Sequence, residues 1–337
     1  AYTREPTLNT SYSPAMTIPE GDDQTVDNKT LTISQVANVQ INYTGEEVRH
    51  LDNGAGFRTV YGDQILQGIR KITNTIETHL GDVIYKGASR AVGTAGVTPF
   101  GSNFDVIAEA RQVLVDNGCP MDGQVTLGLN TLAGTKLRNL GQLQKANEAG
   151  GTELLRRGTL LDLQGVMLKE SAGIASHTKG AGTGYDANGG EPVGETSIVL
   201  DGGTVNTTGI TAGDVVTFAG DTNNYIVGTG ITATSGTIVL NPTGLRETLA
   251  DATEMTIGDS YTANVAFHRA AVELVARAPQ DPPFGDAAVS SQVVTDPFSG
   301  LSYRVSVYQG YGKNMIDITT YYQAKVWKED FVIILMG

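Results

Sequence analysis

The chain has 337 residues, which suggests about two domains and enough apolar surface for a sizeable core. Its longest apolar run, Phe331 to Met336, is too short to span a membrane, so no membrane association is expected. A single cysteine, Cys119, excludes an internal disulfide framework, and we expect a structural role for its thiol. The net charge is -13, and residues 180–262 contain ten acidic residues and one basic residue, Arg246. This acidic part is not expected to bind nucleic acid tightly or to read its sequence.

Residues 1–61 are expected to form a long two-stranded excursion rather than a compact domain. An extended stretch at residues 2–12 and a polar tip at residues 19–23 precede a strand with one apolar face. That face carries Leu31, Ile33, Ala37, Val39, Ile41 and Tyr43. A hairpin with so little to cover it is marginal alone, so we expect a neighbour, which could be another chain. Ala1 is not followed by the charged and apolar regions of a signal peptide, and no secretion signal is expected.

The segment from Asp63 to about Ser89 has the longest helical periodicity in the chain. Its apolar positions are Ile65, Ile69, Ile72, Ile76, Leu80 and Val83. They form one face of a long helix, for which Asp63 is a suitable N-cap after the turn Tyr61-Gly62. We expect this helix to be a spine along which other layers, and other subunits, lie.

Beyond a glycine-rich link at residues 93–101, helices and strands alternate. The pattern predicts a helix at residues 104–115 closed by Asn117-Gly118, a strand at residues 125–129 and a helix from Asn130. Residues 141–151 are expected to form a loop or a frayed helix, and residues 159–169 a strand.

Six glycines between residues 180 and 194 indicate a linker, and an all-β module follows. Its short strands, at residues 197–200, 214–218, 225–227 and 237–240, are separated by turn residues and fit a small barrel. A return to helix is predicted at residues 263–278, ended by Pro279. Strands then close the chain at residues 303–307, 322–327 and 331–336. The predicted fold class is α+β, interrupted by a β insertion.

No chemical motif stands out. HExxH, GxSxG, paired CxxC and a phosphate-binding loop are all absent, and Gly180 to Gly184 lacks the GxGxxG spacing. The histidines, His50, His79, His177 and His268, are scattered and are interpreted as ordinary surface or core residues. We therefore predict no catalytic, cofactor-binding or metal-ligating residue, no cofactor, and no enzyme activity.

The order of elements resembles the major capsid proteins of tailed bacteriophages, with the Hong Kong 97-like fold, and most closely the podovirus type with an inserted β domain. The stretches that carry the resemblance are residues 62–90, 104–110, 158–171, 266–271 and 300–327. None is a catalytic signature, so the resemblance rests on order and spacing.

The resemblance implies an extended E loop at residues 1–61 and a peripheral domain at residues 62–125 and 286–337. It also implies an axial domain at residues 126–191 and 260–285, with an inserted β-barrel domain at residues 192–259. Family members carry an N-terminal arm before the E loop, whereas Ala1 here already lies in loop-like sequence.

The function implied is structural. Copies of the chain would form hexamers and pentamers of an icosahedral virion shell around double-stranded DNA, without sequence-specific contact to the DNA. Assembly would take place in the bacterial host cytoplasm with a scaffolding protein and a portal, and a decoration protein could bind the shell. An encapsulin-like compartment is the alternative within the fold, and a β-rich adhesin or carbohydrate-binding protein is the alternative from another class.

Overall fold

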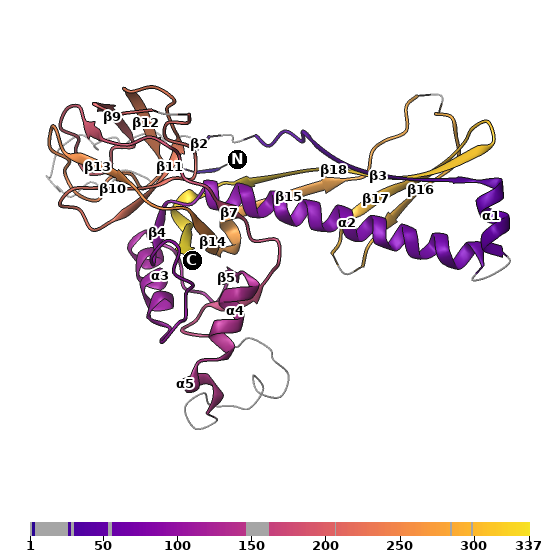
Figure 1. Cartoon of the computed structure of the whole chain (residues 1–337), viewed down its shortest axis with the longest axis horizontal. Helices are drawn as coiled ribbons and strands as arrows, with labels where there is room; N and C mark the ends of the chain where they lie inside the picture. Colours follow the sequence, from indigo (N-terminus) through magenta and orange to yellow (C-terminus); the bar gives the residue numbers. More distant parts are fainter. Residues whose placement is uncertain are drawn as a thin grey trace, which may run out of the picture.

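A computed structural model describes residues 2–3, 26–27, 30–52, 56–145, 162–205, 207–283, 285–297 and 299–337. The molecule is elongated, with a β-barrel at one end and a long arm at the other (Figure 1). A second group of helices and strands lies beside the barrel, around the C-terminus. No helix among the described residues is both long and apolar enough to cross a bilayer.

The arm consists of a helix packed along a five-stranded antiparallel sheet. Helix α2 (Phe57–Lys86) has 30 residues, which at about 1.5 Å per residue gives a rod of roughly 45 Å. The sheet contains β3 (Gln35–Thr44), β15 (Val272–Arg277), β16 (Ala288–Thr295), β17 (Ser302–Gln309) and β18 (Lys313–Val326). Strand β18 is central, because it pairs with β3, β15 and β17.

The predicted apolar face of the spine helix is confirmed by its packing. Ile72 and Ile76 are buried against Ile318 and Tyr322 of β18 in one core cluster. A Cβ at Gly68 would lie 3.1 Å from Ile318 Cδ1, so a glycine lets the helix approach the sheet closely there. The glycine that weakens the helix by propensity therefore contributes to its packing.

The predicted start of the spine helix at Asp63 is wrong. The helix begins at Phe57, after Gly56 in a left-handed conformation with φ of 86°. Tyr61, which we expected in a turn, is buried and its ring lies 4.7 Å from that of Tyr43. This packing favours helix where the local Tyr61-Gly62 pair favours a turn.

Strand β3 has the predicted alternation, with Ala37, Val39, Ile41 and Tyr43 in the core cluster under α2. Its partner differs from the expectation, because all ten residues pair with β18 rather than with the earlier extended stretch. Of that stretch the structure describes only β1 (Tyr2–Thr3), which pairs with β2 (Val26–Asp27), and the rest lies outside the described residues.

Residues 45–52, expected to be part of an extended hairpin, form helix α1 at the tip of the arm (Figure 1). Thr44 and Glu47 make a capping box: Thr44 N donates to Glu47 Oε2 at 2.7 Å, and Glu47 N donates to Thr44 Oγ1 at 3.4 Å. The sequence carried this helix signal.

A second sheet joins the arm to the barrel. Its strands outside the barrel are β4 (Arg90–Val92), β19 (Val332–Met336), β14 (Tyr261–His268), β5 (Val125–Leu129) and β6 (Met167–Glu170), with β7 (Ser176–His177) beside β14. Helices α3 (Asp105–Asp116), α4 (Thr131–Arg138) and α5 (Gly141–Gln144) pack with it around one core. The helix predicted from Asn130 is present as α4, and Asn130 is its N-cap, accepting from Ala133 N at 2.8 Å. Of the strand predicted at residues 159–169, residues 159–161 lie outside the described residues, and the described part contains the start of β6.

The helix predicted at residues 263–278 is wrong. The segment forms β14, a short 3-10 turn at Arg269–Ala271, and β15. Strand β14 is buried on both faces, because Ala266 packs into the core with α3, α4 and α5, whereas Ala263 and Val265 pack into the core with the end of α2. A strand in that position is apolar without a period of two, which is why its run of small and apolar residues resembled a helix.

The predicted barrel is present, with a different first strand. Its strands are β8 (Tyr185–Ala187), β9 (Ser197–Asp201), β10 (Val215–Phe218), β11 (Asn224–Thr229), β12 (Gly236–Leu240) and β13 (Glu254–Ile257). The antiparallel pairings run β10-β13-β8-β9-β12-β11 and return to β10, which closes a six-stranded ring.

The linker predicted at residues 180–194 therefore contains a barrel strand, and the barrel begins before residue 192. Tyr185 of β8 is fully buried in the barrel core. A Cβ at Gly203 would lie 2.1 Å from its ring, and one at Gly182 2.7 Å. These two glycines make room for the tyrosine, so they reflect dense packing rather than a flexible link.

Candidate functional site: the barrel junction

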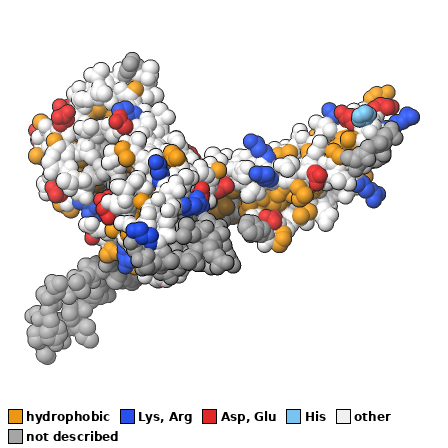
Figure 2. Space-filling model, turned by 60° about the horizontal axis from the view of Figure 1, so that its bottom comes forward, with side chains coloured by type: hydrophobic (Ala, Val, Ile, Leu, Met, Phe, Trp, Pro, Cys, Tyr) orange, Lys and Arg blue, Asp and Glu red, His pale blue; other side chains and the backbone are white. Residues whose placement is uncertain are grey.

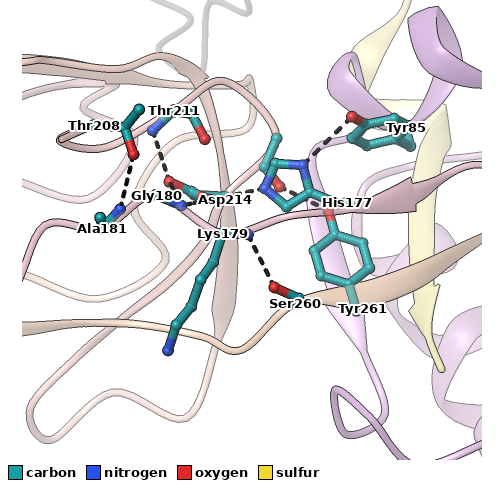
Figure 3. Close-up of polar contacts among 11 residues, drawn as sticks. Tyr85, His177, Lys179, Gly180, Ala181, Thr208, Thr211, Asp214, Ser260 and Tyr261 are labelled. Atoms are coloured by element: carbon teal, nitrogen blue, oxygen red, sulfur yellow. Dashed lines mark hydrogen bonds and ion pairs between the residues drawn. The ribbon is translucent and has the colours of Figure 1, made fainter.

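A buried polar cluster lies where the barrel meets the end of α2 and the second sheet (Figure 3). Its centre is Asp214, which directly precedes β10 and is fully buried. Asp214 Oδ1 accepts from His177 Nε2 at 2.8 Å and from Gly180 N at 3.0 Å, and Oδ2 accepts from Thr211 N at 2.7 Å. The carboxylate thus holds the chain entering the barrel, a barrel loop and β7 at one point.

His177 connects this carboxylate to the body of the molecule. The hydroxyl of Tyr85, in the last turn of α2, lies 3.4 Å from His177 Nδ1. Tyr261 of β14 has its ring centroid 5.2 Å from that of His177 and donates its hydroxyl to Gly213 O at 2.7 Å. Burial raises the pKa of both tyrosines, so both hydroxyls stay protonated and can donate. Four segments distant in the sequence meet here.

The geometry does not suit catalysis. In many enzymes a histidine hydrogen-bonded to a carboxylate acts as the general base, but a general base needs a ring nitrogen that can reach the substrate. Both ring nitrogens of His177 face protein groups, and the side chain is only 6% exposed. The cluster can fix the position of the barrel relative to α2, which is a structural role.

Three further contacts cross the same junction. Asn241 Nδ2 donates to Lys86 O at 2.8 Å and to Ala88 O at 2.6 Å, satisfying carbonyls at the end of α2. Strand β4 pairs with β11 of the barrel. The buried Arg90 donates to Asn223 Oδ1 of the barrel at 3.1 Å and to Asn117 Oδ1 after α3 at 2.9 Å. Together these contacts fix the barrel to both the helix and the sheet.

We expect Asn241→Ala to lower the free energy of unfolding by about 1–2 kcal/mol, because two part-buried carbonyls at the end of α2 lose their donor. Thermal unfolding of the purified protein measures this. Asn188→Ala is the matched control, since the Asn188 amide is exposed and bonds only to Asp201 within the barrel. Equal unfolding temperatures for the two variants would contradict a role for Asn241 in the junction.

The other residues singled out in the sequence lie apart from this cluster. His50 is exposed on α1, His79 faces the edge of the Tyr322 ring at 5.5 Å, and His268 Nε2 lies 3.1 Å from Asp122 Oδ1. Cys119 is buried, and burial raises the pKa of its thiol to about 11, so it is not an activated nucleophile. The described residues contain no group of three or more His, Cys, Asp or Glu side chains placed to hold a metal ion.

A polar cavity of about 640 Å³ lies between the loop that follows β4 and one face of α3. Its lining mixes Arg90 with Glu109 and Asp116, together with uncharged polar side chains. This mixture of charges favours no single ligand chemistry.

No protein-family model and no curated protein matches the sequence. Several solved structures match across almost the whole chain, and two of them have TM-scores above 0.5. One, from Mycobacterium phage Che8, has 15% identity and a TM-score of 0.52, covering 99% of this chain and 81% of that one. The other is titled "Capsid structure of the Cyanophage P-SCSP1u" and has 12% identity and a TM-score of 0.51, again covering 99% of this chain and 81% of that one. The chain has a phage capsid fold.

The expectation of a mixed helix-and-strand capsid fold is thereby confirmed. Within this capsid fold, sequence reasoning missed the junction. In the sequence, Asp214 is one of ten acidic residues between residues 180 and 262, and His177 is one of four scattered histidines. Their partnership depends on β7 and β10 meeting in space across 37 positions of sequence, and no local spacing signals it.

Proposed function

We propose that this chain is a major capsid protein with a Hong Kong 97-like fold, and that its copies assemble into the icosahedral shell around phage double-stranded DNA. The observation that carries the proposal is the likeness to the P-SCSP1u capsid over 99% of the chain. The long helix laid along a sheet supports it, because such an arm gives one subunit a large surface to present to its neighbours. Hexamers and pentamers of one chain need heterologous contacts that close into rings.

The proposed domains follow the sheets rather than the sequence-based boundaries. The peripheral domain takes α2 with β3, β15, β17 and β18, because these elements share one core cluster, and β16, which pairs with β17. The axial domain takes the second sheet with α3, α4 and α5. This moves β3 out of the E loop, β15 into the peripheral domain, and α3, β4 and β19 into the axial domain. The barrel, from β8 to β13, is the inserted domain.

We place the barrel on the outer surface of the shell. Ten acidic residues against one basic residue give residues 180–262 nine net negative charges per copy. Turned inward, these charges would repel packaged DNA at every subunit, whereas outside they face water and salt. A scaffolding protein and a portal would act as partners during assembly, and the DNA would be enclosed without sequence-specific contact.

Negative-stain microscopy of the purified protein tests the proposal. The expected result is closed icosahedral shells, with the barrels projecting outward in a reconstruction. Only dispersed subunits under conditions that assemble other capsid proteins would overturn it and favour a binding protein or adhesin. Shells isolated from cells with a protein cargo instead of nuclease-protected DNA would favour an encapsulin-like compartment.

A further inference from the structure

The two sheets differ in how their edge strands are protected from pairing with another chain. The second sheet ends on one side in the closed barrel, which leaves no edge, and on the other side in β6, which carries the charged residues Lys169 and Glu170. Charges on an edge strand discourage pairing with another chain. In the arm sheet, β3, β15 and β16 each have a strand partner on one side only among the described residues. Strand β15 carries the charged residues Glu273 and Arg277, which leaves β3 and β16 as the two uncharged free edges.

Both free edges lack the usual protection. Strand β3 has ten residues and β16 has eight, and neither contains a charged residue or a proline. Each also exposes valine side chains: Val36 is 58% exposed on β3, and Val289 and Val293 are 61% and 57% exposed on β16. Long, uncharged edges of this kind are templates for pairing with another chain.

Within the arm sheet, only β3 and β16 lack charged residues. The two inner strands of the same sheet carry Arg304 on β17 and Lys313, Asp317 and Lys325 on β18. These inner strands already have partners on both sides, so charge there does not serve to block pairing. An arm that stayed unpaired would be expected to carry charged residues on its edge strands β3 and β16 rather than on its inner strands.

We propose that β16 of one copy pairs with β3 of the next, so that the arm sheets of neighbouring subunits join edge to edge. This inference rests on the proposed self-assembly and names the surface that carries it. Neighbouring strands in the order β3-β18-β17-β16 are all antiparallel. The next copy, placed alongside in the same orientation, therefore presents β3 antiparallel to β16 and continues the pattern of the sheet.

The partner is a second copy because one chain carries both complementary edges. A contact between two different edges is heterologous, and a heterologous contact can close into a ring of five or six. Pairing of β16 with β16 about a two-fold axis would instead leave β3 of both copies exposed. The heterologous contact pairs the backbone of both edges.

The sheet also predicts the register. One row of paired residues crosses it from Ser291 through Ser306 and Asp317 to Gln40. If the next copy continues the sheet without a shift, Ser291 of one subunit lies opposite Gln40 of its neighbour. Both side chains are exposed and belong to the same row, so they lie on the face of the sheet away from α2.

Disulfide trapping tests the pairing. In a Cys119→Ser background, assembled Ser291→Cys/Gln40→Cys protein should form a ladder of covalent oligomers on a non-reducing denaturing gel after mild oxidation. Thr295→Cys/Gln40→Cys is the matched control, because Thr295 is four residues further along β16, about 13 Å away. Each single-cysteine variant should stay monomeric on the same gel.

The outcomes separate the inference from the proposed function. Shells that form without the Ser291–Gln40 ladder would overturn the pairing and leave the capsid assignment standing. A dimer from Ser291→Cys alone would show β16 pairing with itself and also overturn it. A stronger ladder from the Thr295 control would overturn the unshifted register. Dispersed subunits in every variant and in the parent would count against self-assembly itself.

Discussion

Replacing Ile76 with Asp is expected to abolish folding. Ile76 is 3% exposed at the centre of the face that α2 turns toward the arm sheet, beside Ile72 and Tyr322. An Asp there would lose the apolar contacts and bury a carboxylate without a partner, a combined cost of at least about 4–5 kcal/mol. Since total stabilities are about 5–15 kcal/mol, such a loss leaves little or no folded protein. Soluble yield and thermal unfolding measure the effect.

Asn74→Asp is the control, because it introduces the same carboxylate on the same helix at an exposed position. It should stay soluble and unfold within about 0.5 kcal/mol of the parent. Soluble Ile76→Asp protein that assembles like the parent would mean that α2 is not the core of the arm.

The features that could be predicted from the sequence are those set by local periodicity. The 3.6-residue repeat located the face of α2 that contains Ile72 and Ile76, and the two-residue repeat located the inner face of β3. The cap at Asn130 and the turn at Gly118, with φ of 77°, were also readable, because both rest on residues next to one another. Periodicity says which face is buried but not what covers it, so β18 could not be predicted as the partner of β3.

The errors come from residues whose surroundings are set by distant segments. Strand β14 lacks a two-residue repeat because separate cores cover its two faces, one containing Ala266 and the other Ala263 and Val265. The glycines from Gly180 onward suggested a linker, but Gly182 and Gly203 are small because the ring of Tyr185 occupies the space beside them. In both cases tertiary contacts, which the local sequence does not show, determined the structure that the segment adopts.

The junction could not be predicted for the same reason. An aspartate in an acidic module suggests a solvated surface, and only the fold shows that Asp214 is buried and bonded to His177, Gly180 and Thr211. The uncharged edges of β3 and β16 were visible in the sequence as strings of residues. The role of these strands can be inferred only from the sheet order, in which β3 and β16 lie at edges and the charged β17 and β18 lie inside.

A fragment of residues 179–259 is expected to fold by itself, whereas a fragment of residues 192–259 is not. The barrel core is built entirely from residues between Tyr185 and Ile257. The longer fragment keeps β8, which closes the ring between β9 and β13, and it keeps Gly180 as a donor to Asp214. The shorter one loses Tyr185 and Ala187 from the core and leaves two strand edges open.

The two fragments share the same C-terminal end, and NMR spectra of their backbone amides show which of them folds. The longer fragment should give well-dispersed resonances and a cooperative thermal transition, and the shorter one collapsed resonances or aggregation. If both disperse equally, β8 is dispensable and the barrel begins near residue 192 after all. If neither does, the barrel depends on the contacts of Asn241 with the end of α2 and of β11 with β4, and it is a part of the body rather than an autonomous insertion.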